Sequence, residues 1–265
     1  MISYISGSSG FIGSHLTKKL DAIAIAHENL SLVKLKPFEY FYFLSSYGNM
    51  ASHKDEDMIY QANVLDLLAV LKQAKDFKFK SFVFISSSSV QLKTQTTYSR
   101  AKRAAEEILL AFMEKHNLPV CIIRPFTCYG PGEQAEHLIP TILRSCFKGE
   151  QMNFVGEPVH DYIFIDDVVD GIISLSEHGA RGIYQLGTSV QTTNQQVLSL
   201  IEEISGKKAK INKVDSMRAY DNKDWASYNF KARSFGWLPK VKLREGLEKV
   251  VADYIKNPDK YAKSA

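Results

Sequence analysis

Hydrophobic positions along the chain follow two different periods. Short apolar runs predict strands at residues 2–6, 23–26, 40–44, 82–85 and 120–123. Apolar residues at helical spacing predict helices at residues 11–20, 58–74 and 98–116. The run 82–85 is apolar on both faces, which is typical of a strand in the middle of a parallel sheet. Because strands alternate with helices, this half of the chain is predicted to form a doubly wound parallel sheet of the α/β class.

The pattern changes beyond Arg124. Prolines divide the chain into shorter pieces at positions 125, 131, 140 and 158. Helical spacing returns at residues 168–176, 197–204 and 243–255. We therefore expect residues 1–150 to form one domain and residues 151–265 a smaller α/β part, with segment 161–187 returning to the first domain.

Composition narrows the class of protein. The 265 residues are 45% hydrophobic and 23% charged, enough for one α/β unit or for one large and one small domain. The net charge of +4 comes from scattered Lys and Arg residues, so no nucleic-acid partner is expected, although an anionic ligand would suit this charge. Cys121, Cys128 and Cys146 have no short paired spacing, which predicts neither a disulfide framework nor a metal site. With no signal peptide and no apolar run of membrane-spanning length, we expect a cytoplasmic protein without a membrane partner.

A glycine-rich segment follows the first predicted strand. It reads Gly7-Ser8-Ser9-Gly10-Phe11-Ile12-Gly13 and leads into a predicted helix. In such a turn one glycine permits the tight bend, one lets the backbone approach a pyrophosphate, and one lets the helix pack on the strand. The helix N-terminus adds free N–H groups and a positive dipole end. A plain tight turn is the alternative, but its position after the first strand favours a dinucleotide site.

Tyr98 and Lys102 open the helix predicted at 98–116. A spacing of four places the phenol and the ammonium on one helical face. A free phenol has a pKa of about 10, so an ammonium about 4 Å away could lower it toward neutrality. The predicted strand before this helix ends in Ser86-Ser87-Ser88-Ser89, which brings hydroxyls to the carboxyl edge of the sheet, where ligands of such folds bind.

These motifs together resemble those of the extended short-chain dehydrogenases, which epimerise, dehydrate or reduce nucleotide sugars on a Rossmann-type sheet. The resemblance extends over nearly the whole chain. The matching motifs, in order, are GSSGFIG at 7–13, NVL at 63–65, YSRAK at 98–102, RPFTCYGPG at 124–132, DYIFIDDV at 161–168, YQLG at 184–187 and FGWLP at 235–239.

The resemblance implies a role for each matching residue. Tyr98 would be the acid–base residue, Ser87 would hydrogen-bond the reacting oxygen, and Lys102 would hold the ribose hydroxyls and lower the tyrosine pKa. Residues implied to bind the cofactor are Gly7, Gly10, Phe11, Ile12, Gly13, His27, Glu28, Leu44, Ser45, Ser46, Asn63, Ser86, Tyr98, Lys102 and Pro125. Residues implied to bind the substrate are Ser88, Thr127 and Arg218.

The chain also departs from the family's pattern. Thr127 replaces the usual substrate-binding Asn, and His160 replaces the usual Arg before Asp161. Few residues separate Ser87 from Tyr98, so an active-site loop is shortened. Segment 30–38 is too short for the family's helix, strand and helix, so part of the ribose side of the sheet is expected to be missing.

The sequence disfavours one of the reactions of this family and leaves the others open. Family dehydratases carry Asp-Glu directly after the catalytic hydroxyl residue, whereas this chain has Ser88-Ser89, which disfavours dehydration. A nucleotide-sugar epimerase and a reductase of a nucleotide-linked keto-sugar both remain. A dinucleotide-binding sensor without catalysis is the third hypothesis, disfavoured because both Tyr98 and Lys102 are present.

The choice of dinucleotide depends on the end of the second strand. An acidic side chain there bonds both ribose hydroxyls and repels a 2′-phosphate. If Glu28 turns inward, NAD is preferred; if His27 does, NADP and a reductase role are favoured. The absence of Arg or Lys between Leu20 and Leu32 favours NAD and hence the epimerase.

The resemblance also implies a homodimer. Helices 58–74 and 98–116 would pair with their symmetry mates in a four-helix interface, which needs apolar surface beyond the face that covers the sheet. The apolar residues that could form this interface are Leu67, Leu68, Val70, Leu71, Ile108, Leu109, Leu110 and Phe112. As the alternative, these residues belong to the core of a monomer.

Overall fold

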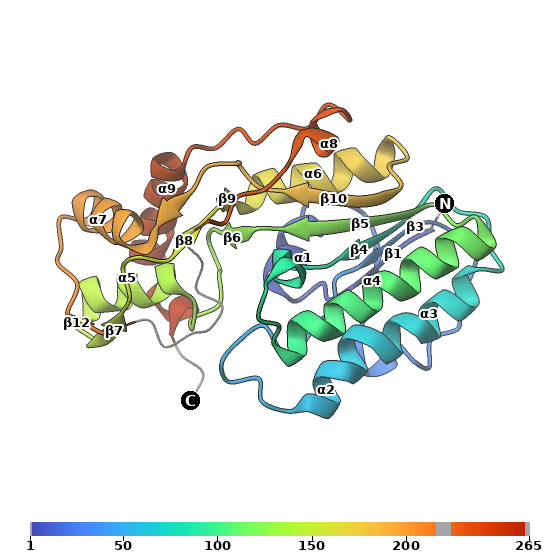
Figure 1. Ribbon diagram of the computed structural model, residues 1–265, viewed down its shortest axis with the longest axis horizontal. Helices are drawn as coiled ribbons and strands as arrows, with labels where there is room; N and C mark the ends of the chain where they lie inside the picture. The colour runs from blue at the N-terminus through green and yellow to red at the C-terminus, as the bar shows by residue number, and fades with distance from the viewer. Residues whose placement is uncertain (1, 216–223, 263–265) are drawn as a thin grey trace. The chain divides into compact units, whose positions relative to one another are not determined.

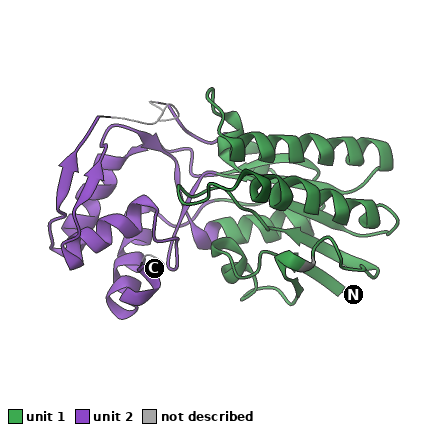
Figure 2. Cartoon of the chain, turned by 90° about the horizontal axis from the view of Figure 1, so that it is seen from below, with its two compact units in different colours: residues 1–125, 168–186, 229–238 green, residues 126–167, 187–228, 239–265 purple. Residues whose placement is uncertain are grey.

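The computed structural model describes residues 2–215 and 224–262. The chain forms two compact units, coloured separately in Figure 2. Unit 1 comprises the chain up to Pro125 together with Val168–Leu186 and Asn229–Leu238, and unit 2 comprises the remainder.

Unit 1 is built on a parallel sheet of six strands in the order β10-β5-β4-β3-β1-β2 (Figure 1). The strands are β1 (Ile2–Ser6), β2 (Ile23–Ile25), β3 (Phe38–Phe43), β4 (Ser81–Ile85), β5 (Val120–Pro125) and β10 (Gly182–Leu186). In the described chain β2 is an edge strand, in agreement with the short segment 30–38. The first five strands were predicted within a few residues of their ends, because each is a separate apolar run.

Helices cover both faces of this sheet. They are α1 (Phe11–Leu16), α2 (Glu56–Tyr60), α3 (Asp66–Ala74), α4 (Thr97–His116), α6 (Ile165–Glu177, whose first three residues belong to unit 2) and α8 (Phe230–Arg233). Shorter turns are the 3-10 segments η1 (His27–Asn29) and η3 (Ser88–Gln91), and the π segment η2 (Gln61–Leu65), which joins α2 to α3. Helices α3 and α4 lie side by side (Figure 1). On the opposite face, Tyr42 of β3 hydrogen-bonds Ser176 of α6.

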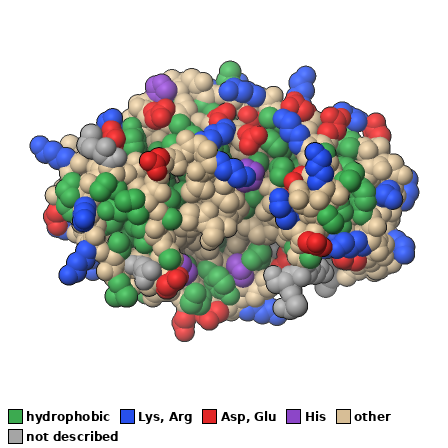
Figure 3. All heavy atoms as spheres, turned by 180° about the vertical axis from the view of Figure 1, so that it is seen from behind, with side chains coloured by type: hydrophobic (Ala, Val, Ile, Leu, Met, Phe, Trp, Pro, Cys, Tyr) green, Lys and Arg blue, Asp and Glu red, His purple; other side chains and the backbone are tan. Residues whose placement is uncertain are grey.

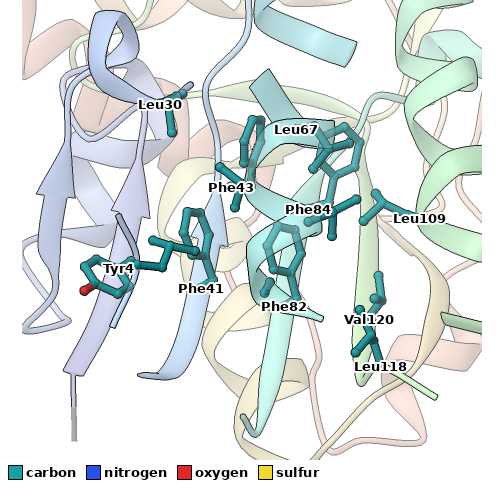
Figure 4. Packing of buried hydrophobic residues seen from close by; sticks show 14 of the residues in the cluster. Tyr4, Leu30, Phe41, Phe43, Leu67, Phe82, Phe84, Leu109, Leu118 and Val120 are labelled. Carbon is teal, nitrogen blue, oxygen red and sulfur yellow. The ribbon is translucent and has the colours of Figure 1, made fainter. Parts of the chain in front are cut away.

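Aromatic rings fill the layer between the sheet and helices α3 and α4 (Figure 4). Phe41 and Phe43 of β3 point to the same face because side chains alternate along a strand, and Phe82 and Phe84 of β4 do likewise. The rings of Phe41 and Phe82 stack at 5.1 Å between centroids. Burying an aromatic side chain of this size contributes roughly 1.5–3 kcal/mol, so this ladder fixes the register of the two strands that lead to the site.

Unit 2 is assembled from short strand pairs and helices. The pairs are β6 (Thr127–Tyr129) with β9 (Tyr162–Phe164), β7 (Met152–Phe154) with β12 (Ile211–Lys213), and β8 (Val159–His160) with β11 (Thr192–Thr193). The helices are α5 (Leu138–Lys148), α7 (Asn194–Ser205) and α9 (Leu243–Lys256), followed by the 3-10 turn η4 (Pro258–Tyr261). Asp161 is fully buried and accepts backbone N–H bonds from Thr188, Ser189 and Ser227, so one carboxylate joins three segments of the unit.

The structure differs from the sequence prediction at helix α1, at helix α5 and at the first boundary between the units, and it adds the later strands β6–β12. Helix α1 ends at Leu16 and not near residue 20. Helix α5 was not predicted because Pro140 was interpreted as a break, but Pro140 is the third residue of the helix, where its missing N–H has no intrahelical partner to lose. The first boundary between the two units follows Pro125, whereas the sequence prediction placed a domain boundary after residue 150. Helix α5 belongs to unit 2 because it packs with α7 and β7 of that unit.

Two features of the described residues concern membrane spanning and surface charge. No helix within the described residues is long and apolar enough to cross a membrane. On the face drawn in Figure 3, Lys and Arg side chains are interspersed with Asp and Glu.

Candidate active site

The strand order of unit 1 reverses at β1, which lies between β2 and β3. In open α/β sheets ligands bind in the crevice at the carboxyl ends of the strands where the order reverses. The segments that follow β1 and β3 meet there, since the backbone N–H groups of Leu44 and Ser45 donate to the carbonyl and the hydroxyl of Ser6 at 3.2 and 3.3 Å. The glycine turn and the predicted residues Leu44, Ser45 and Ser46 therefore lie at the point where the strand order reverses.

The glycine turn is as tight as its sequence predicts. Gly7 has φ +71°, and a Cβ on it would lie 2.7 Å from the carbonyl carbon of Leu44. A Cβ on Gly13 would lie 2.0 Å from the Gly7 carbonyl oxygen, so α1 packs against the turn only because residue 13 has no side chain. Gly10 is exposed, and its nearest neighbour for a Cβ is the Gly7 oxygen at 3.3 Å. The Gly10 N–H donates to the Gly7 carbonyl oxygen at 3.1 Å, and Phe11 and Ile12 supply the first N–H groups of α1 next to this exposed glycine.

Tyr98 stands in the first turn of α4. Thr96 caps this helix: the Ser99 N–H donates to the Thr96 hydroxyl at 3.2 Å and the Thr96 N–H donates to the Ser99 hydroxyl at 2.8 Å. The cap fixes the direction in which Tyr98 leaves the helix. Its side chain hydrogen-bonds those of Ser87 and Ser46, so three hydroxyls from the ends of β3, β4 and α4 meet.

Lys102 lies one turn further along α4. Its side chain is 1% exposed and its ammonium donates to the carbonyl oxygen of Ile85 at 2.8 Å. That is the one hydrogen-bond acceptor that the described residues supply to it, whereas an ammonium has three protons to donate. Burial lowers the pKa of Lys102 to about 7, against the opposing effect of Glu106. Lys102 therefore has donors to spare for a polar ligand.

The electrostatics of Tyr98 differ from the expectation that Lys102 lowers its pKa. Burial raises the pKa of Tyr98 above its ordinary value, against the lowering effect of its hydrogen bonds to Ser46 and Ser87. The Lys102 nitrogen lies 6.0 Å from the centroid of the Tyr98 ring and is directed at Ile85. Tyr98 is accordingly a neutral phenol at neutral pH in this structure.

Asn63 connects the helix pair α2–α3 to the site. It is fully buried in the π segment η2, and its amide nitrogen donates to the carbonyl oxygens of Tyr47 and Ile59. Its amide oxygen accepts the hydroxyl of Ser46 at 3.0 Å. Isolated π turns are frequent at functional sites.

Two of the predicted residues follow β2. His27 lies in η1 and its Nδ1 is 3.0 Å from a carboxylate oxygen of Asp66, which is 2% exposed. Glu28 is exposed. The structure thus ties His27 to α3 and leaves the Glu28 carboxylate at the surface.

Three further predicted residues lie at the ends of β4 and β5. Ser86 is buried and donates to Glu106, which also forms an ion pair with Arg124, so its hydroxyl is engaged inside the protein. Ser88 is 8% exposed in η3, and Pro125 is the last residue of β5. Sequence analysis missed Glu106, although its position four residues after Lys102 on α4 was a signal that the two share a helical face.

Two of the predicted substrate residues come after Pro125 in the sequence. Thr127 belongs to unit 2, where its hydroxyl lies 3.3 Å from Nδ1 of His160. Arg218 lies outside the described residues.

Residues 26–187 match the family described as the NAD dependent epimerase/dehydratase family. The matched region is more than half of the chain and includes Ser87, Tyr98 and Lys102. The chain belongs to this family.

Members of the epimerase/dehydratase family and solved structures extend the similarity. The UDP-glucuronate 4-epimerase of Thermodesulfobacterium geofontis is 26% identical over 220 residues, covering 77% of this chain and 68% of the relative. The dTDP-D-glucose 4,6-dehydratase of Mus musculus is 28% identical over 258 residues, covering 91% of this chain and 69% of the relative. A structure of the UDP-glucuronic acid 4-epimerase from Bacillus cereus with UDP-glucuronic acid and NAD aligns with a TM-score of 0.82 at 24% identity, covering 97% of this chain and all of that one. This likeness shows that the fold is shared.

Proposed function

We propose that this protein is an NAD-dependent nucleotide-sugar epimerase that acts by transient hydride transfer at a sugar carbon. The observation that carries the proposal is the meeting of Tyr98 and Ser87 at the carboxyl edge of the sheet, in the same unit as a glycine turn shaped for a pyrophosphate. Family membership places this chemistry among NAD-dependent epimerases and dehydratases.

The residues of unit 1 fit a dinucleotide. A Cβ at Gly7 or Gly13 would fill the turn, and the open surface at Gly10 leaves room for a pyrophosphate beside the N–H groups that begin α1. Lys102 has unused donors for ribose hydroxyls. NAD held by these residues would supply a reversible hydride acceptor, and inversion at the sugar carbon would require the hydride to return to the opposite face.

Tyr98 and Ser87 would carry out the proton transfer. Tyr98 would exchange a proton with the sugar hydroxyl while Ser87 donates a hydrogen bond to the same oxygen. Because burial holds the pKa of Tyr98 high, a nearby positive charge is needed before it can act as a base. The Lys102 ammonium would supply part of that charge once a ligand draws it away from Ile85.

The substrate proposal rests on the relatives and on three residues of this chain. UDP-glucuronate and UDP-glucose are the sugars to test first, since relatives named for them are similar to this chain. Ser88, Thr127 and Arg218 are proposed to contact the substrate. Incubating the protein with each sugar and NAD, then resolving the C4 epimers by proton NMR, tests the function. Interconversion by the wild type and none by Tyr98→Phe would support it; no turnover of any nucleotide sugar tried would contradict it.

A reductase remains the second candidate, and one observation favours it. The reduction of a ketone needs a protonated donor, and the raised pKa keeps Tyr98 protonated at neutral pH. The two functions differ in their use of cofactor: a reductase consumes one NADH or NADPH per product, whereas an epimerase leaves the cofactor total unchanged.

The choice of NAD over NADP is proposed to rest on Glu28. An exposed carboxylate at the end of β2 can accept the ribose hydroxyls and would repel a 2′-phosphate. We expect NADH to bind more tightly than NADPH in the wild type, and Glu28→Ala to reduce that preference. NADPH binding to the wild type at least as tightly as NADH would contradict this choice.

We also propose a cytoplasmic homodimer assembled through α2–α3 and α4. Half of the residues that the sequence suggested for the interface lie instead in the core of unit 1, where they are fully buried: Leu67, Val70, Leu71 and Leu109. Leu68, Ile108, Leu110 and Phe112 are partly buried, and the last three of these pack against the same core. The exposed apolar side chains on this helix pair are instead Met58, Tyr60 and Leu65, at 37%, 45% and 52% exposure. These three residues support the dimer proposal.

A further inference from the structure

The carboxylate of Glu106 is buried where helix α4 meets the ends of strands β4 and β5. Its side chain is 2% exposed. One oxygen accepts the hydroxyl proton of Ser86, which follows β4, and the Nε–H of Arg124 on β5 at 2.9 Å. The other oxygen accepts from Nη2 of the same Arg124, so the guanidinium binds the carboxylate in a bidentate pair. Three donors on two segments therefore fix the position of this negative charge.

Lys102 and Glu106 reach neighbouring residues of the same strand end. They are four apart on α4 and therefore share a helical face. The Lys102 ammonium donates to the Ile85 carbonyl at 2.8 Å, while the Glu106 carboxylate accepts from Ser86, the next residue. The Ser86 N–H donates to a carbonyl of β5 at 2.7 Å, so this backbone is itself fixed. The two opposite charges are thus anchored to adjacent residues, immediately before Ser87.

Glu106 is the charged group that opposes the effect of burial on Lys102. Burial lowers the pKa of Lys102 to about 7, and Glu106 acts in the opposite direction. The Phe84 ring, whose centroid lies 4.7 Å from the Lys102 nitrogen, also favours the charged form. The other ionisable groups nearby are Tyr98 on α4, a neutral phenol at neutral pH, and Arg124 on β5, which is paired with Glu106. The Glu106 carboxylate is therefore the negative charge on which the ammonium depends.

We propose that Glu106 is a positioning residue: its carboxylate is the fixed counterion of the Lys102 ammonium at the end of β4. The inference rests on the proposed function, in which Tyr98 acts as a base only beside a positive charge. Glu106 acts through Lys102 and contacts neither the cofactor nor the substrate. A stabilising role alone is a weaker explanation of the buried pair with Arg124, because the desolvation of two charges commonly offsets their attraction.

Removing the charge of Glu106 should change the titration of Lys102. Glu106→Gln keeps the shape of the side chain and leaves Arg124 unpaired. Both changes disfavour a nearby ammonium, so the pKa of Lys102 should fall from about 7 by about one unit. NMR of the ligand-free protein carrying ¹³Cε-labelled lysine follows this titration, and the Lys102 signal is the one absent from Lys102→Met. This measurement requires no activity.

Glu107→Gln is the matched control. Glu107 is the next residue on α4 and is exposed. Its replacement removes the same charge from the same helix, but at the surface, where solvent screens it. The Lys102 titration should therefore keep its wild-type pKa in this variant.

A double variant tests the inference even if an unpaired Arg124 prevents Glu106→Gln from folding. Glu106→Gln combined with Arg124→Met removes both charges of the pair, which a protein interior commonly tolerates better than the loss of one. The pKa of Lys102 should again be lower than in the wild type, because the effect of Glu106 is lost.

Turnover should show the same dependence on pH. With a Lys102 pKa of about 7 in the wild type and about 6 in Glu106→Gln, the charged fraction differs about fivefold at pH 7 and about twofold at pH 6. We therefore expect kcat of Glu106→Gln to be about fivefold below wild type at pH 7 and about twofold below at pH 6. A merely structural role would lower kcat by the same factor at both pH values.

Three results would overturn the inference. An unchanged Lys102 pKa in folded Glu106→Gln or in the double variant would mean that Glu106 is not its counterion. An equal decrease in Glu107→Gln would assign the effect to the overall charge of the helix. A loss of kcat that does not depend on pH would leave Glu106 a structural role only. Absence of epimerisation with every sugar would contradict the proposed function, while the lysine titration would still decide whether Glu106 is the counterion.

Discussion

Tyr98 is the residue on which the proposed chemistry depends most. Replacing it with Phe removes the hydroxyl but keeps the ring that packs against the Gly48 backbone. General acid–base catalysis typically contributes about 10²–10⁴-fold, so turnover by Tyr98→Phe should fall by that factor. Calorimetry should show that NADH still binds. Activity within a few-fold of the wild type would remove Tyr98 from the mechanism.

Lys102 makes stability depend on pH. Its pKa is about 7 in the folded protein and about 10.4 in an unfolded chain, so between these values the unfolded chain binds more protons. The free energy of unfolding should therefore rise with pH from 7 to about 10, by up to roughly 4 kcal/mol at 1.36 kcal/mol per pKa unit. The burial cost of this group is largest at pH 7 and below.

The Lys102→Met variant isolates this effect. It removes the titrating group but keeps most of the apolar length of the side chain. We expect a higher free energy of unfolding than wild type at pH 7, and a flatter rise toward pH 9, in urea denaturation at both pH values. Equal slopes in the two proteins would show that Lys102 keeps an ordinary pKa in the fold.

The turn between β1 and α1 contains glycines that differ in the space available for a side chain. A side chain at Gly13 would collide with the Gly7 carbonyl, whereas Gly10 has open space. We expect Gly10→Asp to fold, as judged by circular dichroism, but to lose NADH binding, because a carboxylate would occupy the proposed path of the pyrophosphate. Gly13→Ala should instead lower the melting temperature. Unchanged cofactor affinity in a folded Gly10→Asp protein would contradict the assignment of this turn.

The assembly of the whole molecule can be tested through the exposed apolar residues of the π segment. Leu65→Lys should disrupt the proposed dimer, because a charge would be buried at the interface. Light scattering should give twice the 29.9 kDa chain mass for the wild type and the single mass for the variant. Leu32→Lys is the control: Leu32 is 76% exposed and lies away from these helices in the sequence, so the dimer should persist. A wild type of single chain mass at micromolar concentration would contradict the dimer.

Much of unit 1 followed from the sequence because its signals are local. Each strand is a separate apolar run, the glycine turn is a contiguous motif, and Tyr98 and Lys102 are one helical turn apart. Unit 2 was harder to predict because its strands span only two or three residues, too few for a periodic pattern. Pro140 concealed α5 because a proline is tolerated in a first turn and excluded from a helix interior.

The sequence by itself determined the residue types and their order: the glycines, the hydroxyls after β4, and the Tyr–Lys pair. Only the tertiary structure decided how these groups are charged and directed. Burial raises the pKa of Tyr98 and lowers that of Lys102, and neither shift can be read from spacing, since desolvation depends on what packs around a side chain. The hydrogen bond from Ser46 to Asn63 joins two segments that are separate in the sequence, and the two backbone carbonyls that orient the Asn63 amide meet it only in the folded chain.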